Sequence, residues 1–373
     1  MRNLSDTIAS LRSNQRRGYA AGPATPSRLS QFNEFGTNPG ALRAYSYLPK
    51  NMPDHAPLVV VLHGCTQTAA RYDHGAGWSQ LADRRGFALL YPEQQRANNP
   101  NLCFNWFVPE DIRRESGEAL SIAQMVKRML EVHSLDSQRV FITGLSAGGA
   151  MTSVMLATYP ELFASGAIIA GLPFACATTV PEAFERMRGH NLPSKRQLEA
   201  MVRGASSHQG PWPTLSVWHG TADVTVAPAN MDAIVAQWRG LHGAQGVSPK
   251  ENAFGGHVQR VWCNEAGVPK IEAFTIAGMG HGTPLDGSDE IGTPGAFMLD
   301  AGISSTHHIA RFWTLTDSIS EPSFSGPVER LTSAPMCEQA ASTISAPELR
   351  VRDHTADVGK AIEHALRAAG LMR

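Results

Sequence analysis

Residues 144–148 (GLSAG) place Ser146 between two flanking glycines. A serine hydroxyl is a weak nucleophile at neutral pH and needs an adjacent base that is itself oriented by a third group. An apolar run at 139–143 predicts a strand before the serine, and 148–159 predicts a helix after it. Glycines are needed in such a tight turn, because side chains there would collide with the strand and the helix. Ser146 is therefore a candidate nucleophile for acyl transfer.

Candidates for the acid and the base lie later in the chain. Asp223 follows a predicted strand at 214–218, and His281 stands between two glycines after a predicted strand at 271–276. The chain order of serine, acid and histidine is the order found in α/β-hydrolases. We expect His281 to take the proton of Ser146 and Asp223 to orient the imidazole.

Other residues could fill these two roles. His307 and His308 are rival bases, but they fall inside a predicted helix. Asp286 and Asp289 are rival acids, but they come after His281 and so break the chain order.

A second loop could stabilise the oxyanion of the tetrahedral intermediate. His63, Gly64 and Cys65 follow the predicted strand 58–62. In α/β-hydrolases such a loop supplies one backbone N–H donor, and the residue after the nucleophile supplies the other. The predicted donors are the N–H groups of Cys65 and Ala147.

Four side chains near these loops are candidate substrate-binding residues. They are His63, Trp106, Trp212 and Trp218. For His63, hydrogen bonds within its own loop are the favoured explanation. For the three tryptophans, core packing explains the sequence equally well.

The rest of the chain alternates strands and helices. Strands are predicted at 41–48, 58–62, 87–91 (stopped by Pro92), 139–143, 164–170, 214–218 and 271–276, and helices at 69–85, 118–133, 148–159, 229–241 and 302–314. This alternation is typical of a mostly parallel sheet covered by helices on both faces. The predicted fold class is α/β, in the form of an α/β-hydrolase with a small cap insertion.

Three segments interrupt the alternation. Residues 1–40 are predicted to be an irregular N-terminal arm, and 41–315 to be the hydrolase domain. Within it, 177–212 is either a cap over the active site or an ordinary crossover that packs on the sheet. Residues 316–373 are predicted to be a linker followed by a short amphipathic helix.

The composition excludes several classes of partner. The chain has 373 residues and a net charge of -1, so no overall field favours nucleic acid. No apolar run approaches the roughly 18 residues of a transmembrane helix. The N-terminal segment lacks the apolar core of a secretory signal. We therefore expect a cytoplasmic protein, with secretion as the alternative, and leave the oligomeric state open.

The five cysteines fit no metal motif, so the sequence predicts no metal site. Cys65 and Cys103 both lie in loops at the carboxyl edge of the predicted sheet. A bridge between them would brace the oxyanion loop, although a cytoplasmic location disfavours disulfides. Small buried thiols are the alternative.

Several motifs together resemble the polyhydroxybutyrate depolymerase family of esterases, which includes feruloyl and acetylxylan esterases. They are 62–67 (LHGCTQ), 103–107 (CFNWF), 144–149 (GLSAGG), 210–213 (GPWP), 218–223 (WHGTAD) and 278–284 (GMGHGTP). The resemblance covers about residues 38–315. Its order of motifs is similar to that of the type 1 catalytic domain of short-chain-length polyhydroxyalkanoate depolymerases.

The resemblance implies a serine esterase that needs no cofactor and cleaves 3-hydroxybutyrate-type polyesters or their oligomers. A feruloyl or acetylxylan-type carbohydrate esterase is the alternative enzyme. An inactive hydrolase-fold protein that binds polyester granules is the alternative outside the enzymes.

Overall fold

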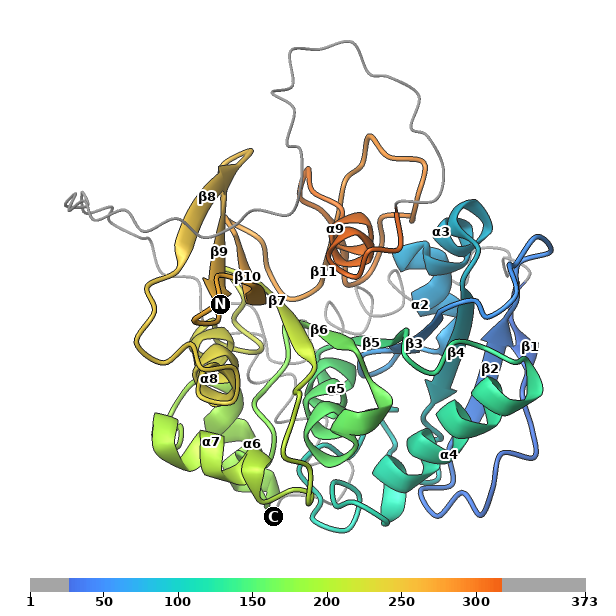
Figure 1. Cartoon of the computed structure of the whole chain (residues 1–373), viewed down its shortest axis with the longest axis horizontal. Helices are drawn as coiled ribbons and strands as arrows, with labels where there is room; N and C mark the ends of the chain where they lie inside the picture. Colours follow the sequence, from blue (N-terminus) through green and yellow to red (C-terminus); the bar gives the residue numbers. More distant parts are fainter. Residues whose placement is uncertain (1–26, 317–373) are drawn as a thin grey trace, which may run out of the picture.

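The computed structural model describes residues 27–316, which build a ten-stranded sheet with helices on both faces (Figure 1). In chain order the strands are β1 (Ser30–Gln31), β2 (Arg43–Tyr47), β3 (Leu58–Leu62), β4 (Ala88–Glu93), β5 (Val140–Leu145), β6 (Ser165–Ile169), β7 (Thr214–Gly220), β8 (Lys250–Phe254), β9 (His257–Cys263) and β10 (Pro269–Ile276). Across the sheet their order is β1-β2-β4-β3-β5-β6-β7-β10-β9-β8. A separate pair, β11 (Thr283–Leu285) and β12 (Met298–Asp300), follows β10.

The middle of the sheet is parallel and its two margins are antiparallel. The pairs from β4 through β3, β5, β6 and β7 to β10 are parallel, whereas β1, β2, β8 and β9 pair antiparallel. Parallel neighbours require crossover connections, here made by helices. The carboxyl ends of β3, β5, β7 and β10 meet at one edge, where ligand sites of such sheets form. The predicted α/β class is confirmed.

Helices cover both faces of the sheet. One face carries α4 (Gly117–Val132), α5 (Ala147–Thr158) and α8 (Ala229–Arg239), and the other carries α2 (Ala69–Ala76), α3 (Trp78–Arg85) and α9 (Ser305–Phe312) (Figure 1). All five residues of β3 are buried. Leu58, Val60 and Leu62 pack on the first face, whereas Val59 and Val61 pack on the second. A continuous apolar strand is therefore what this position requires.

The single helix predicted over 69–85 is two helices that meet at Gly77. This glycine has a φ of 74°, and a Cβ there would lie 2.4 Å from the backbone nitrogen of Gly292. Asp73 Oδ1 accepts the N–H of Ser79 at 2.8 Å and so satisfies the start of α3. The residue at the break must therefore be glycine because of a chain segment more than 200 residues away, which local periodicity does not reveal.

The strand predicted to stop at Pro92 continues to Glu93. β3 pairs with β4 only as far as Leu90, so Pro92 has a strand neighbour on the β2 side alone. The missing N–H of a proline is tolerated at such an edge-like position.

The antiparallel margin beyond β10 was not predicted. β8 is a polar edge strand (KENAF), and β9 buries only part of its residues. A polar edge strand gives only a weak pattern of apolar residues in the sequence. It has a neighbouring strand on one side only, and only one of its faces packs against the protein. β11 and β12 have three residues each and are too short for a periodicity signal.

The segment 177–212 contains two helices in different surroundings, α6 (Val180–Met187) and α7 (Lys195–Arg203). α7 packs on α8 and α5; it buries Leu198, and it places Val202 in the main core. α6 instead places Ala183 in a smaller cluster with Ala147, the residue after Ser146. The crossover interpretation fits α7, and only α6 lies where a cap would.

The described part of the predicted N-terminal arm is bonded to the rest of the molecule. β1 pairs with β2, and the N–H of Gly40 donates to Ser121 Oγ at 2.8 Å. The helix predicted at 302–314 is α9. Apart from residue 316, the predicted linker and amphipathic helix lie outside the described residues.

Candidate active site

Ser146 occupies the sharp turn between β5 and α5, with φ 57° and ψ −118°. Such a positive φ is uncommon outside glycine and is kept only where surrounding structure enforces it. The N–H of Ser146 donates to the carbonyl of Ile169 at 2.9 Å. A Cβ on Gly148 would lie 2.4 Å from the carbonyl oxygen of Leu62, and one on Gly144 equally close to Gly148. Close backbone packing therefore requires both glycines, as predicted.

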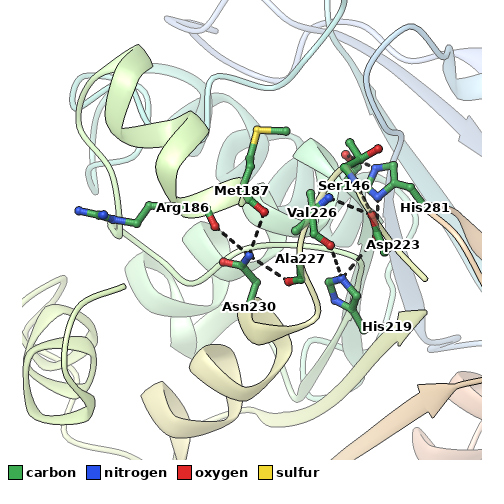
Figure 2. Close-up of polar contacts among 10 residues, drawn as sticks. Ser146, Arg186, Met187, His219, Asp223, Val226, Ala227, Asn230 and His281 are labelled. Carbon is green, nitrogen blue, oxygen red and sulfur yellow. Dashed lines mark hydrogen bonds and ion pairs between the residues drawn. The ribbon is translucent and has the colours of Figure 1, made fainter. Parts of the chain in front are cut away.

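Three side chains from three loops form a continuous hydrogen-bond chain (Figure 2). His281 Nε2 lies 2.9 Å from Ser146 Oγ, and His281 Nδ1 lies 2.7 Å from Asp223 Oδ2. The side chain of His281 is 9% exposed and that of Asp223 is 0% exposed. With the Nδ1–H donating to the carboxylate, Nε2 accepts the serine hydroxyl proton. This arrangement can deprotonate Ser146 as it attacks a carbonyl.

The carboxylate of Asp223 is buried but has many donors. Its Oδ1 accepts the N–H groups of Thr225 and Val226, each at 2.9 Å. Burial alone would raise its pKa, but hydrogen bonds and charge from His219 and His281 hold the pKa well below its usual range. An ionised acid beside the imidazole stabilises the imidazolium that forms when the base takes a proton.

One imidazole near Asp223 was not predicted. His219 Nε2 lies 3.4 Å from Asp223 Oδ2 and 2.8 Å from the carbonyl oxygen of Val226. Its place in the same motif, four residues before Asp223, is the sequence signal that could have indicated it.

The rival residues are engaged elsewhere. His307 Nε2 lies 3.0 Å from Asp289 Oδ2. The His308 ring packs against Trp218, with ring centroids 5.9 Å apart, and Asp286 accepts the hydroxyl of Ser288. Each therefore has a structural partner away from Ser146.

The loop after β3 holds the other candidate donors. Within residues 27–316, the N–H groups of Cys65 and Ala147 have no acceptor, so both can serve an oxyanion. Gln67 Oε1 accepts the N–H of Gly64 at 2.8 Å and fixes the turn. A disulfide joins Cys65 to Cys103, so the bridge that the sequence left open is formed. Cys176 is a free, buried thiol.

His63 supports this loop and does not line a substrate site. It is 1% exposed, its Nδ1 bonds the carbonyl of Gly64 at 2.8 Å, and its Nε2 accepts the N–H of Gln94 at 3.1 Å. Burial lowers the pKa of His63 to about 4, so the ring is neutral. The favoured explanation, that His63 is hydrogen-bonded within its own loop, is confirmed. Its prediction as a substrate-binding residue is wrong, because the imidazole is buried.

A buried polar network lies behind the oxyanion loop, and the sequence did not indicate it. Glu118 accepts the side-chain N–H of Gln94 at 2.5 Å and the backbone N–H of Asn105 at 2.9 Å. Gln94 also donates to the carbonyl of Cys103 at 3.1 Å. Burial and neighbouring Asp111 raise the pKa of Glu118 to about 8, although both hydrogen bonds act in the opposite sense.

The three tryptophans divide into core and site. Trp218 is fully buried and stacks on Phe274 with ring centroids 3.8 Å apart, and Trp212 packs edge-on against Trp238 in the main core. Neither is placed to bind substrate, so both predictions are corrected. Trp106 belongs to the cluster that contains Ala147 and remains a candidate.

Exposed apolar side chains flank the acid and the base. Phe297 is 37% exposed, and its ring lies edge-on to His281 with centroids 6.2 Å apart. Val224, next to Asp223, is 52% exposed. An apolar ester could contact these side chains on its way to Ser146.

Two further features concern metals and membranes. In the described range of the chain, no three His, Cys, Asp or Glu side chains are grouped as a metal site. No helix there is long and apolar enough to cross a membrane.

A mostly parallel sheet with a serine on a strand–turn–helix elbow defines an α/β-hydrolase. Residues 43–253 match the model of the family described as "Esterase PHB depolymerase". The chain belongs to this family, and it is a carboxylic-ester hydrolase with a serine nucleophile.

Individual relatives agree with this family. The chain is 47% identical to poly(3-hydroxyalkanoate) depolymerase C of Paucimonas lemoignei over 289 residues, which cover 76% of this chain and 70% of the relative. It is 32% identical to feruloyl esterase B of Talaromyces stipitatus, over 69% of this chain and 73% of that one. A solved acetyl xylan esterase from Aspergillus awamori matches with a TM-score of 0.63 and 27% identity, over 68% of this chain and 93% of that one.

Proposed function

We propose that Ser146, His281 and Asp223 are the nucleophile, base and acid of an ester hydrolase that forms an acyl-enzyme. The observation that carries this proposal is the continuous hydrogen-bond chain from Asp223 through His281 to Ser146. It is the geometry that activates a serine for acyl transfer.

The reaction proceeds in two steps. Ser146 Oγ attacks the ester carbonyl while His281 Nε2 takes its proton, and the N–H groups of Cys65 and Ala147 stabilise the oxyanion. His281 returns the proton to the departing alcohol as the ester C–O bond breaks. Water, deprotonated by His281, then attacks the acyl-enzyme, and the acid product leaves with Ser146 restored. Asp223 stays ionised and stabilises the imidazolium throughout.

The proposed substrate is a short-chain 3-hydroxyalkanoate polyester or its oligomers. The depolymerase from Paucimonas lemoignei, at 47% identity, supports this choice. The exposed apolar side chains of Phe297 and Val224 beside the site suit an uncharged polyester.

Side chains near Ser146 would form the acyl pocket. We assign this role to Trp106 and to the face of α6 that carries Ala183, because both share a cluster with Ala147. Residues 41–315 would form the catalytic domain, in which α6 is the cap. The disulfide beside the oxyanion loop favours an oxidising compartment over the predicted cytoplasmic one.

A feruloyl or acetylxylan-type esterase is the second candidate, supported by the relatives of that name. A panel of 3-hydroxybutyrate oligomers, polymer suspension, methyl ferulate and acetylated xylan separates the two. The highest kcat/KM is expected on the oligomers, and a preference for methyl ferulate or acetylated xylan would overturn the substrate assignment.

A fluorophosphonate probe tests the catalytic proposal against a granule-binding protein without activity. Labelling of wild type and its loss in Ser146→Ala are expected. An unlabelled wild type that still binds polyester particles would favour the binding protein.

A further inference from the structure

His219 lies near the end of β7 and points toward the turn that carries Asp223 (Figure 2). The residue is 1% exposed. A buried imidazole loses its hydration, so its polar atoms must be used or the fold is weakened. What His219 contacts therefore indicates why this position holds a histidine.

The contacts of His219 determine its tautomer. Its Nε2 lies 2.8 Å from the carbonyl oxygen of Val226, which can only accept a hydrogen bond, so Nε2 carries the proton. The same nitrogen is 3.4 Å from Asp223 Oδ2. Its Nδ1 is buried and has no hydrogen-bond partner within residues 27–316. The N–H at Nε2 therefore bonds the turn and lies close to the carboxylate, whereas the other ring nitrogen contacts neither.

These contacts close a small ring around Asp223. The N–H of Val226 donates to Asp223 Oδ1 at 2.9 Å, and the carbonyl of the same residue accepts from His219. The carboxylate is thus fixed on one oxygen by the backbone turn and on the other by His281 and His219. Without His219, the turn loses a donor and Oδ2 loses its polar neighbour at 3.4 Å.

We propose that His219 is a positioning residue that holds Asp223, through the Val226 turn and the carboxylate itself, in the orientation that His281 requires. The inference rests on the proposed function of Asp223 and His281. His219 touches no reacting atom and acts only through the acid. Without the N–H that His219 donates, the carboxylate of Asp223 can rotate away from His281.

The test uses two substitutions that separate the donor from the volume. In His219→Gln, the side-chain amide nitrogen is the same number of bonds from Cα as the imidazole Nε2, so the donor is retained. In His219→Phe, the ring volume is retained and the donor is lost. For a soluble p-nitrophenyl ester we expect His219→Phe to lower kcat roughly 10- to 100-fold, the range of a hydrogen bond to a charged group, with KM within about twofold. His219→Gln should recover most of that loss.

A matched control is His242→Phe. His242 is also buried, and its Nε2 has no hydrogen-bond partner among the described residues, but its ring stacks on Trp238 of the main core. The His242→Phe variant should have a changed melting temperature and an unaltered kcat. If His219→Phe does not fold, His219→Asn replaces it, because its shorter amide cannot reach the Nε2 position.

A double-substitution cycle provides the decisive outcome. In an Asp223→Ala background, His219→Phe should cost less than about threefold, because its effect passes through Asp223. The inference would be overturned if the losses of kcat from Asp223→Ala and His219→Phe multiplied in the double variant. It would also be overturned if His219→Gln lost as much kcat as His219→Phe, or if His219→Phe kept the wild-type kcat. Failure of the proposed function is distinguishable, since it would show as wild-type protein that fluorophosphonate does not label.

Discussion

The two halves of the site are held in place by different means. The half with Ser146 and the oxyanion loop is fixed by a disulfide, by backbone contacts at glycines and by the buried network around Glu118. The half with Asp223 and His281 depends on hydrogen bonds within the loop after β7 and on one hydrogen bond that joins this loop to the loop after β10. A change to the contacts that support the first half should therefore alter catalysis and folding stability together. In the second half, they should be separable.

The largest expected effect is that of Ser146→Ala, which removes the covalent route and leaves both halves otherwise intact. Ester hydrolysis should fall on the order of 10⁴-fold or more. The melting temperature should stay within about 2 °C, since one exchangeable hydrogen bond is lost. Steady-state kinetics and thermal denaturation measure both. Retention of more than a few per cent of activity would refute the assignment of the nucleophile.

Removal of the disulfide tests the coupling in the first half. For Cys65→Ala/Cys103→Ala we expect stability to fall by about 2–4 kcal/mol. Displacement of an oxyanion donor should lower kcat by up to about 10²-fold. Urea denaturation and kinetics on one preparation give the two numbers. If kcat is unchanged while stability falls, the bridge braces the fold and not the oxyanion site.

Phe297→Ala tests the separability expected of the second half. Loss of about 1 kcal/mol of apolar contact should raise the KM for an apolar ester about fivefold. Stability should hardly change, because the side chain is 37% exposed. Val132→Ala on α4, exposed to 47%, is the matched control. An equal rise in KM in both variants would argue against a substrate contact at Phe297.

The last prediction concerns pH and Glu118, in the buried network of the first half. Its carboxyl has a pKa of about 8 when folded, against a reference value of 4.5. Between about pH 5 and pH 8 the unfolded chain therefore loses this proton while the folded chain keeps it, so stability falls as pH rises.

Glu118→Gln removes this titration. Its melting temperature should improve relative to wild type by a few degrees as pH rises through that window. The exposed Glu110→Gln is the control for loss of one carboxylate. A constant difference between Glu118→Gln and wild type across the pH range would contradict the raised pKa.

Prediction from the sequence was most successful where local pattern and function coincide. The buried strands and the elbow carry continuous apolar runs and fixed glycines, so the parallel sheet and the position of Ser146 could be inferred. Where contacts from distant segments decide the structure, the sequence was insufficient. Gly77, where the helix breaks, lies so close to the backbone of Gly292 that no side chain fits, and Trp212 and Trp218 pack inward although they flank motif loops.

The buried polar groups were the least predictable. Glutamate is usually exposed, and histidine occurs in many environments, so residue type alone does not indicate the roles of Glu118 and His219. Only their hydrogen-bond and charge partners in the fold do so. No spacing along the chain brings Gln94, Asn105 and Glu118 together. Such networks are specified by tertiary packing and must be read from the fold.

The contact between Gly148 and the carbonyl of Leu62 has a practical consequence for enzyme engineering. The first turn of α5 packs directly against the backbone of the strand that leads into the oxyanion loop. This side of the pocket therefore has no room for new side chains. A mutant library aimed at longer or bulkier polyesters should leave positions 144–149 untouched. Diversity belongs at positions 224 and 297, where exposed side chains can change size while the backbone stays as it is.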